Sequence, residues 1–140
     1  MKDWYEPLRN VPWPVDERQR AQIPNWIDTD HEHAEKSKLV LADMLRQGLG
    51  KSSRIDENFD AILAWSKKHQ RPIVINEFGV YTKHADKNDA MAWTAAVREA
   101  AEQRGFGWSL WDYLGDFGFG GDVVPGRREW DSERLEALGF

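Results

Sequence analysis

The sequence has no cysteine, and this absence excludes disulfide bonds, thiolate metal sites and a cysteine nucleophile. It has no apolar run of membrane-spanning length. Residues 1–7 show no apolar stretch typical of a signal peptide, and the sequence does not determine the cellular compartment. Basic side chains are not in excess, since the net charge is −5 and both signs are interspersed. This balance argues against partners such as nucleic acid, which requires a basic stripe, and anionic membranes.

Tryptophan, by contrast, is abundant, with eight among 140 residues. Its ring is large and has one polar edge, so it suits surfaces that stack on the C–H faces of sugars. Trp65 and Trp93 lie within helical patterns and are expected to pack in the core. Trp111 is the residue we expect to serve as a platform for a sugar.

Two short apolar runs with a helical pattern between them form the centre of the chain. Residues 72–79 read PIVINEFG, residues 89–104 are helical in pattern, and residues 106–111 read FGWSLW. Strand, helix, strand is a βαβ unit, which predicts a parallel sheet with strands covered on both faces. Ligands of α/β folds bind at the carboxyl ends of such strands. We therefore expect Glu77 and Trp111 to face one pocket.

The first 54 residues are predicted to form an irregular preamble followed by a helix. Four of the six prolines lie in residues 1–27, and proline interrupts regular hydrogen bonding, so at most a short strand is expected over residues 4–8. The capping-box spacing of Thr29 and Glu32 predicts a helix that ends near Gln47. Its apolar stripe is expected to comprise Leu39, Val40, Met44 and Leu45.

Residues 55–140 are predicted to follow the order helix, strand, helix, strand, helix, within one domain of residues 1–140. Ser53 begins the first of these helices. Phe59, Ile62 and Leu63 follow at helical spacing and predict one buried face. Ser132 is expected to cap a last short helix. The glycine-rich residues 112–122 are expected to form a loop.

These motifs resemble the C-terminal part of glycoside hydrolase family five, the cellulase-type (β/α)8 barrels. The family's seventh strand ends in a glutamate within such an EFG run, as at Glu77. Its eighth ends in a tryptophan followed by an acidic residue, as at Trp111. Residues 3–7, DWYEP, look like its sixth-strand motif, with Asp3 where the family has a histidine. A whole barrel takes about 250 residues, so the resemblance implies an α/β fold of about the last three βα units, a partial TIM barrel.

The resemblance also implies a role for each residue. Glu77 would be the nucleophile of a retaining glycosidase that hydrolyses β-linked glucans such as cello-oligosaccharides, and Tyr5 would donate a hydrogen bond to it. Trp111 would stack on the sugar. The full set of expected substrate-binding residues is Trp111, Trp108, Asp112 and Asn76. No cofactor and no metal are implied.

A second carboxyl group is the component that the sequence leaves open. Retaining hydrolysis needs two carboxyl groups about 5–5.5 Å apart, and the family's acid/base glutamate is expected upstream of this chain. Glu6, Asp112 and Asp116 are candidates that spacing does not separate. The alternative is a non-catalytic protein, which is a carbohydrate-binding or structural barrel fragment whose Glu77 is held by an arginine or a backbone amide.

A partial barrel has open strand edges, which template further pairing or must be covered. We therefore expect a homodimer or larger homo-oligomer. The alternative is a monomer in which residues 1–50 fold back as a cover.

Residues 28–35 gather side chains that bind metals, namely Asp28, Asp30, His31, Glu32, His33 and Glu35. A zinc site is one interpretation. Acidic residues at a helix N-terminus are the simpler one, because on one helix His31 and His33 would point about 200° apart. We therefore expect no metal.

Overall fold

The computed structural model describes residues 3–112, 117 and 131–140. Within these residues the elements, in chain order, are η1 (Asp3–Tyr5), η2 (Glu17–Trp26), α1 (Ala34–Arg46), α2 (Ser53–His69), β1 (Val74–Phe78), η3 (Thr82–His84), α3 (Lys87–Gln103), β2 (Gly107–Leu110) and α4 (Ser132–Ala137), where η denotes a 3-10 helix. No helix in the described part of the chain is both long and apolar enough to cross a membrane.

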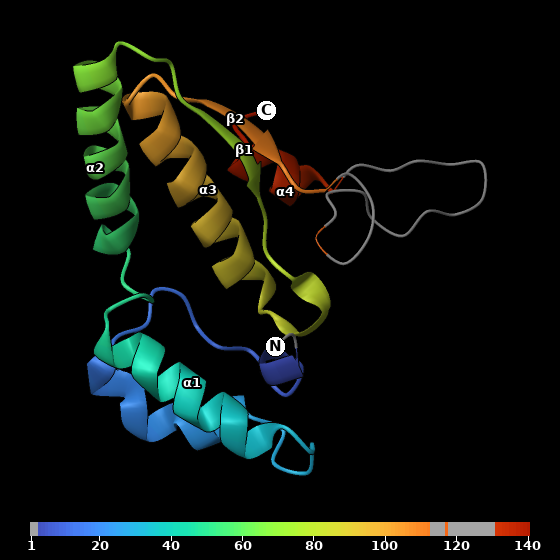
Figure 1. The fold of residues 1–140 in the computed structure, drawn as a ribbon. Coiled ribbons are helices and arrows are strands. Elements are labelled where there is room, and N and C mark those ends of the chain that lie inside the picture. Colours follow the sequence, from blue (N-terminus) through green and yellow to red (C-terminus); the bar gives the residue numbers. More distant parts are fainter. Residues whose placement is uncertain (1–2, 113–116, 118–130) are drawn as a thin grey trace.

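The centre of the fold is the βαβ unit that the sequence predicts. β1 and β2 pair in parallel, and α3 connects them (Figure 1). Asp86 caps α3 by accepting hydrogen bonds from the amides of Asn88 and Asp89, which satisfies donors that a helix start leaves free. Gly105 follows the helix with a φ of +70°, a conformation that glycine adopts at low cost.

The helix α3 packs through small side chains. Its buried residues are Ala90, Thr94, Val97, Ala100 and Ala101. They lie in one core with Phe78 and Phe106, which are also buried. α4 packs against α3, and the guanidinium of Arg98 donates to the carbonyl oxygen of Ala137 at 3.1 Å. Asp131, not Ser132 as expected, caps α4.

A second core lies among η2, α1 and the chain before them. It comprises Val15, Ile23, Ile27, Ala34, Leu41 and Leu45. The preamble is therefore more regular than expected, because a ten-residue 3-10 helix occupies it. Its capping box is at Asp16 and Gln19. The short strand expected over residues 4–8 is absent from the described chain apart from a single bridge between Leu8 and Ile27.

The predicted start of α1 is wrong, and of its predicted apolar stripe only Leu45 is buried. The helix begins at Ala34, not at Thr29, because residues 28–34 form turns in which the amide of Ala34 bonds to the carbonyl of His31. Leu39 is 73% exposed, and the buried side of α1 is instead Ala34, Ser37, Leu41 and Leu45.

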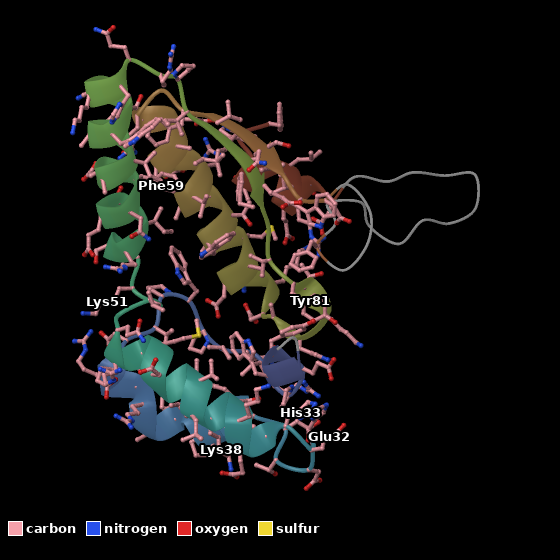
Figure 2. The ribbon with its side chains drawn as sticks, viewed as in Figure 1. Glu32, His33, Lys38, Lys51, Phe59 and Tyr81 are labelled. Carbon is pink, nitrogen blue, oxygen red and sulfur yellow. The ribbon has the colours of Figure 1, made fainter. Side chains whose placement is uncertain are left out.

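Apolar surface on α2 and β1 is less covered than expected. No residue of α2 is buried. Phe59 faces α3 (Figure 2), where its ring lies 5.9 Å from that of Phe106. Trp65 is 51% exposed, so the prediction that it packs in the core is wrong. Val74 is 64% exposed, so β1 is not covered on both faces. Trp93 does pack, 6.2 Å from the ring of Phe78.

Candidate active site at the strand ends

Glu77 and Trp111 lie at the same edge of the sheet, where both strands end. Phe78, the residue after Glu77, is paired with Leu110, the residue before Trp111. The amide of Trp111 donates to the carbonyl oxygen of Phe78 at 2.8 Å. Two residues far apart in sequence are therefore joined by the backbone of the two strands.

Gly79 permits this close approach. A Cβ atom at this position would lie well under 3.0 Å from the carbonyl oxygen of Trp111, a separation that real Cβ atoms essentially never show. It would also lie 3.6 Å from the ring of Phe117. Glycine is thus required by a neighbouring backbone and not by its own torsion angles. This role was not predicted from the sequence, although a glycine at a strand is a signal of close backbone approach.

Glu77 is exposed, and so is the neighbouring Asn76. Among the described residues, no hydrogen bond or ion pair to the Glu77 carboxylate is found. The interpretation in which an arginine or an amide holds Glu77 therefore has no support in this part of the chain. Trp111 is 52% exposed, which leaves a large part of its indole accessible to a ligand.

Asp112 follows Trp111 through a cis peptide bond. Its side chain is half-buried. Its Oδ1 atom is buried and has no hydrogen-bond partner among the described residues. A buried carboxylate oxygen loses its hydration, so Asp112 has unused hydrogen-bonding capacity beside the platform.

Trp108 is placed differently from Trp111. Its indole N–H donates to Glu102 of α3 at 3.2 Å. Its ring meets that of Phe78 edge to face, with centroids 5.9 Å apart. These contacts make Trp108 a packing residue of the βαβ unit, and its expected role in binding substrate has no support from them.

Tyr5 is linked to the strand ends by a series of contacts between aromatic rings. Tyr81, on the segment after β1, lies 5.9 Å from Tyr5 and 5.5 Å from Phe117. Ser37 of α1 holds η1 in place, because its hydroxyl donates to the carbonyl oxygen of Trp4. The hydrogen bond expected from Tyr5 to Glu77 is not formed in the structure. Asp3 lies in η1 as well.

No contact among the described residues joins another candidate carboxylate to Glu77. Glu6 lies 3.5 Å from the Nε2 atom of His31. Asp116 lies outside the described residues, as does most of the loop expected over residues 112–122. Among residues 3–112, 117 and 131–140, no group of three or more potential metal ligands is found. The rings of His31 and His33 are 5.4 Å apart. Both residues precede the helix, so the helical geometry in which they would point about 200° apart does not apply to them.

The model of a known protein family matches most of the chain. The model of the cellulase family, glycosyl hydrolase family 5, matches residues 25–116. The chain belongs to this family. The match includes Glu77 and Trp111, whereas Tyr5 lies before it.

Three relatives illustrate the similarity. Endoglucanase H of Acetivibrio thermocellus is 34% identical over 84 residues, which are 57% of this chain and 9% of that protein. Cel5A of Thermotoga maritima, solved with mannotriose, is 36% identical in sequence and superposes with a TM-score of 0.56. The match covers 62% of this chain and 27% of the Cel5A chain. The cellulose synthase subunit Z of Clostridioides difficile is also 36% identical, with a TM-score of 0.56 over 62% of this chain and 28% of its own.

The chain thus spans about a quarter of the length of these solved family 5 structures. It is a glycoside hydrolase-like protein with an α/β fold that matches a fragment of the family's barrel. The elements that match contain one strand end with a glutamate and one with a tryptophan.

Proposed function

We propose that this chain forms the nucleophile side of a retaining β-glycosidase site that acts on β-linked glucans. Glu77 is the nucleophile and Trp111 the sugar platform, and Asn76 and Asp112 bind sugar hydroxyls. The observation that carries the proposal is the pairing of the two strand ends, which brings to one edge of the sheet an exposed indole and an exposed carboxylate that has no partner among the described residues. Relatives support the substrate class, since Cel5A of Thermotoga maritima has been solved with cellobiose.

The reaction has two steps. In the first, Glu77 attacks the anomeric carbon as the bond to the leaving oxygen breaks, and a second carboxyl group gives that oxygen its proton. In the second, water attacks the glycosyl ester and the same group takes the proton back. Without an acid, the rate falls by a factor of about 10²–10⁴.

The source of the acid is the second part of the proposal. Glu6 lies against His31, so Asp112 is the better placed of the described candidates. The other source is a carboxyl group outside the described residues, either in the same chain or in a second copy of the protein.

We propose that the chain represents about the last three βα units of a barrel. The bare apolar surface on α2 and β1 is then covered by association, which sedimentation equilibrium would detect as a mass above that of one chain.

Hydrolysis of aryl β-glucosides and soluble β-glucan tests the catalytic role. The wild-type protein is expected to hydrolyse both, and Glu77→Gln to lose the activity. Glu136→Gln, a matched change at an exposed position of α4, is expected to have no effect. Equal and negligible rates for the wild type and Glu77→Gln would exclude the enzyme.

A carbohydrate-binding protein is the second candidate, because no contact among the described residues joins a second carboxyl group to Glu77, while Trp111 is exposed. It predicts that cellotetraose binds in calorimetry and that Trp111→Ala abolishes binding, with no hydrolysis in either protein. Absence of binding by the wild type would exclude this candidate also.

A further inference from the structure

A large cavity lies beside the strand ends and is distinct from the Glu77 carboxylate. Its volume is about 910 Å³, within the range of small-molecule sites. It lies between the N-terminal core and the start of α3, and Figure 2 shows one of its lining residues, Tyr81, on the segment that follows β1. Its aromatic lining comprises Trp4, Tyr5, Trp13, Tyr81, Trp93 and Phe117.

The remaining wall is mostly aliphatic, and few polar side chains reach it. Those of Asn10, His84 and Asp89 line the cavity. Burial, together with the nearby charges of Arg9 and Lys83, lowers the pKa of His84, so its imidazole is neutral at pH 7. The carboxylate of Asp89 disfavours an anion. The wall therefore suits an uncharged, apolar molecule with one or two polar atoms.

The cavity adjoins the strand ends through shared residues, although neither Glu77 nor Trp111 lines it. Gly79 lines it and also contacts the carbonyl of Trp111. Phe117 lines it and lies next to both Gly79 and Tyr81. Gly79 and Phe117 thus belong both to the cavity wall and to the surroundings of the strand ends.

We propose that this cavity binds the uncharged aromatic or alkyl aglycone of a β-glycoside whose sugar lies at Glu77 and Trp111. A further run of glucose units would need many hydrogen-bond partners, since buried hydroxyl groups without partners are costly. The wall supplies few. The inference rests on the proposed function and adds a substrate class to it, glycosides with an apolar leaving group.

The test uses the full chain and an uncharged fluorescent probe, N-phenyl-1-naphthylamine. The probe is expected to bind with a micromolar Kd. Ala85→Trp fills the cavity from its wall and is expected to weaken binding at least tenfold. Ala61→Trp adds the same side chain at an exposed position of α2 outside the cavity and is expected to leave binding unchanged. Circular dichroism checks that both variants fold. Should Ala85→Trp fail to fold, Leu49→Glu places a charge at a partly exposed lining residue and is expected to have the same effect.

Competition then separates this inference from the proposed function. Phenyl β-glucoside is expected to displace the probe at least tenfold better than methyl β-glucoside, and Glu77→Gln is expected to bind the probe as the wild type does. Displacement without hydrolysis would retain the aglycone site and reject the catalytic proposal. Equal displacement by both glucosides, or probe binding that neither cavity variant weakens, would overturn the inference. So would sedimentation data showing a dimer that excludes the probe, because a second copy would then fill the cavity.

Discussion

Replacement of Gly79 by alanine tests the close approach of the two strand ends. The new methyl group would overlap the carbonyl oxygen of Trp111 and lie 3.1 Å from its carbonyl carbon. The clash is with backbone, so rotation of a side chain does not relieve it. Either β1 or the segment at Trp111 must move.

The size of the effect follows from what that movement breaks. Overpacking costs about 1–3 kcal/mol. Separation of the strand ends also removes the hydrogen bond between the amide of Trp111 and the carbonyl of Phe78, which is 2.8 Å long and contributes about 1 kcal/mol. We expect Gly79→Ala to lower the free energy of unfolding by about 2–4 kcal/mol on this basis.

Urea denaturation followed by tryptophan fluorescence measures this change. Gly107→Ala is the matched control, because its Cβ would lie 3.4 Å from a methyl group of Val74, an ordinary contact. Both variants share the loss of unfolded-state entropy that any Gly→Ala change brings, about 0.4–1 kcal/mol. If both variants unfold with free energies within about 0.5 kcal/mol of each other, a spread typical of neutral surface changes, the steric argument fails.

Three further changes test other contacts. Arg104→Met removes ion pairs of 2.9 and 2.7 Å to two aspartates of α2; these aspartates are exposed, so we expect a loss of only about 1 kcal/mol in chemical denaturation, and no loss would show that other contacts hold α2. Ser37→Ala removes the buried hydroxyl that bonds to the carbonyl of Trp4; we expect a loss of about 1–2 kcal/mol and faster proteolysis of η1, and unchanged proteolysis would contradict the anchoring role. Burial tends to raise the pKa of Asp131, but the hydrogen bond and charge of Lys87 outweigh it and the pKa is lowered; the stabilisation is therefore present above the unfolded value of about 3.9 and is lost as pH falls through the folded value. Asp131→Asn should flatten the pH dependence of the melting temperature below about pH 4. If the melting temperature of the variant falls with pH as that of the wild type does, Asp131 is not the source of this dependence.

The βαβ unit was predictable because its signals are local and periodic. A short apolar run that stops at Glu77, a helical pattern ended by Gly105, and a second run that stops at Trp111 determine two parallel strands and a helix. The start of α1 was not predictable from Thr29 in the same way. Turn hydrogen bonds within residues 28–34 replace the capping box in the structure, and the spacing of residue types alone does not distinguish the two arrangements.

The exposure of α2 and β1 was mispredicted for a different reason. The pattern of Phe59, Ile62 and Leu63 shows which side of the helix is apolar, but not how much of the rest of the molecule is present to cover it. The same holds for Val74 on β1, which is 64% exposed. For the candidate site, the placement of Glu77 and Trp111 at one edge of the sheet was predicted from their positions at strand ends. Gly79 was missed because its role depends on which backbone passes beside it.

The contacts that the described residues make to position Glu77 and Trp111 lie within the βαβ unit and directly after its first strand. They are the strand pairing, one backbone hydrogen bond and the absence of a side chain at Gly79. These contacts hold the two strand ends together in a chain that matches only about a quarter of a family 5 structure, and they would place the proposed nucleophile and the proposed sugar platform at one edge of the sheet. A general acid is different, since it must reach the leaving oxygen from the other side of the bond about 5–5.5 Å from the nucleophile. Any hydrolysis lost on Glu77→Gln therefore identifies the nucleophile, and whether that activity depends on protein concentration distinguishes a proton donor in the same chain, such as Asp112, from one in a second copy.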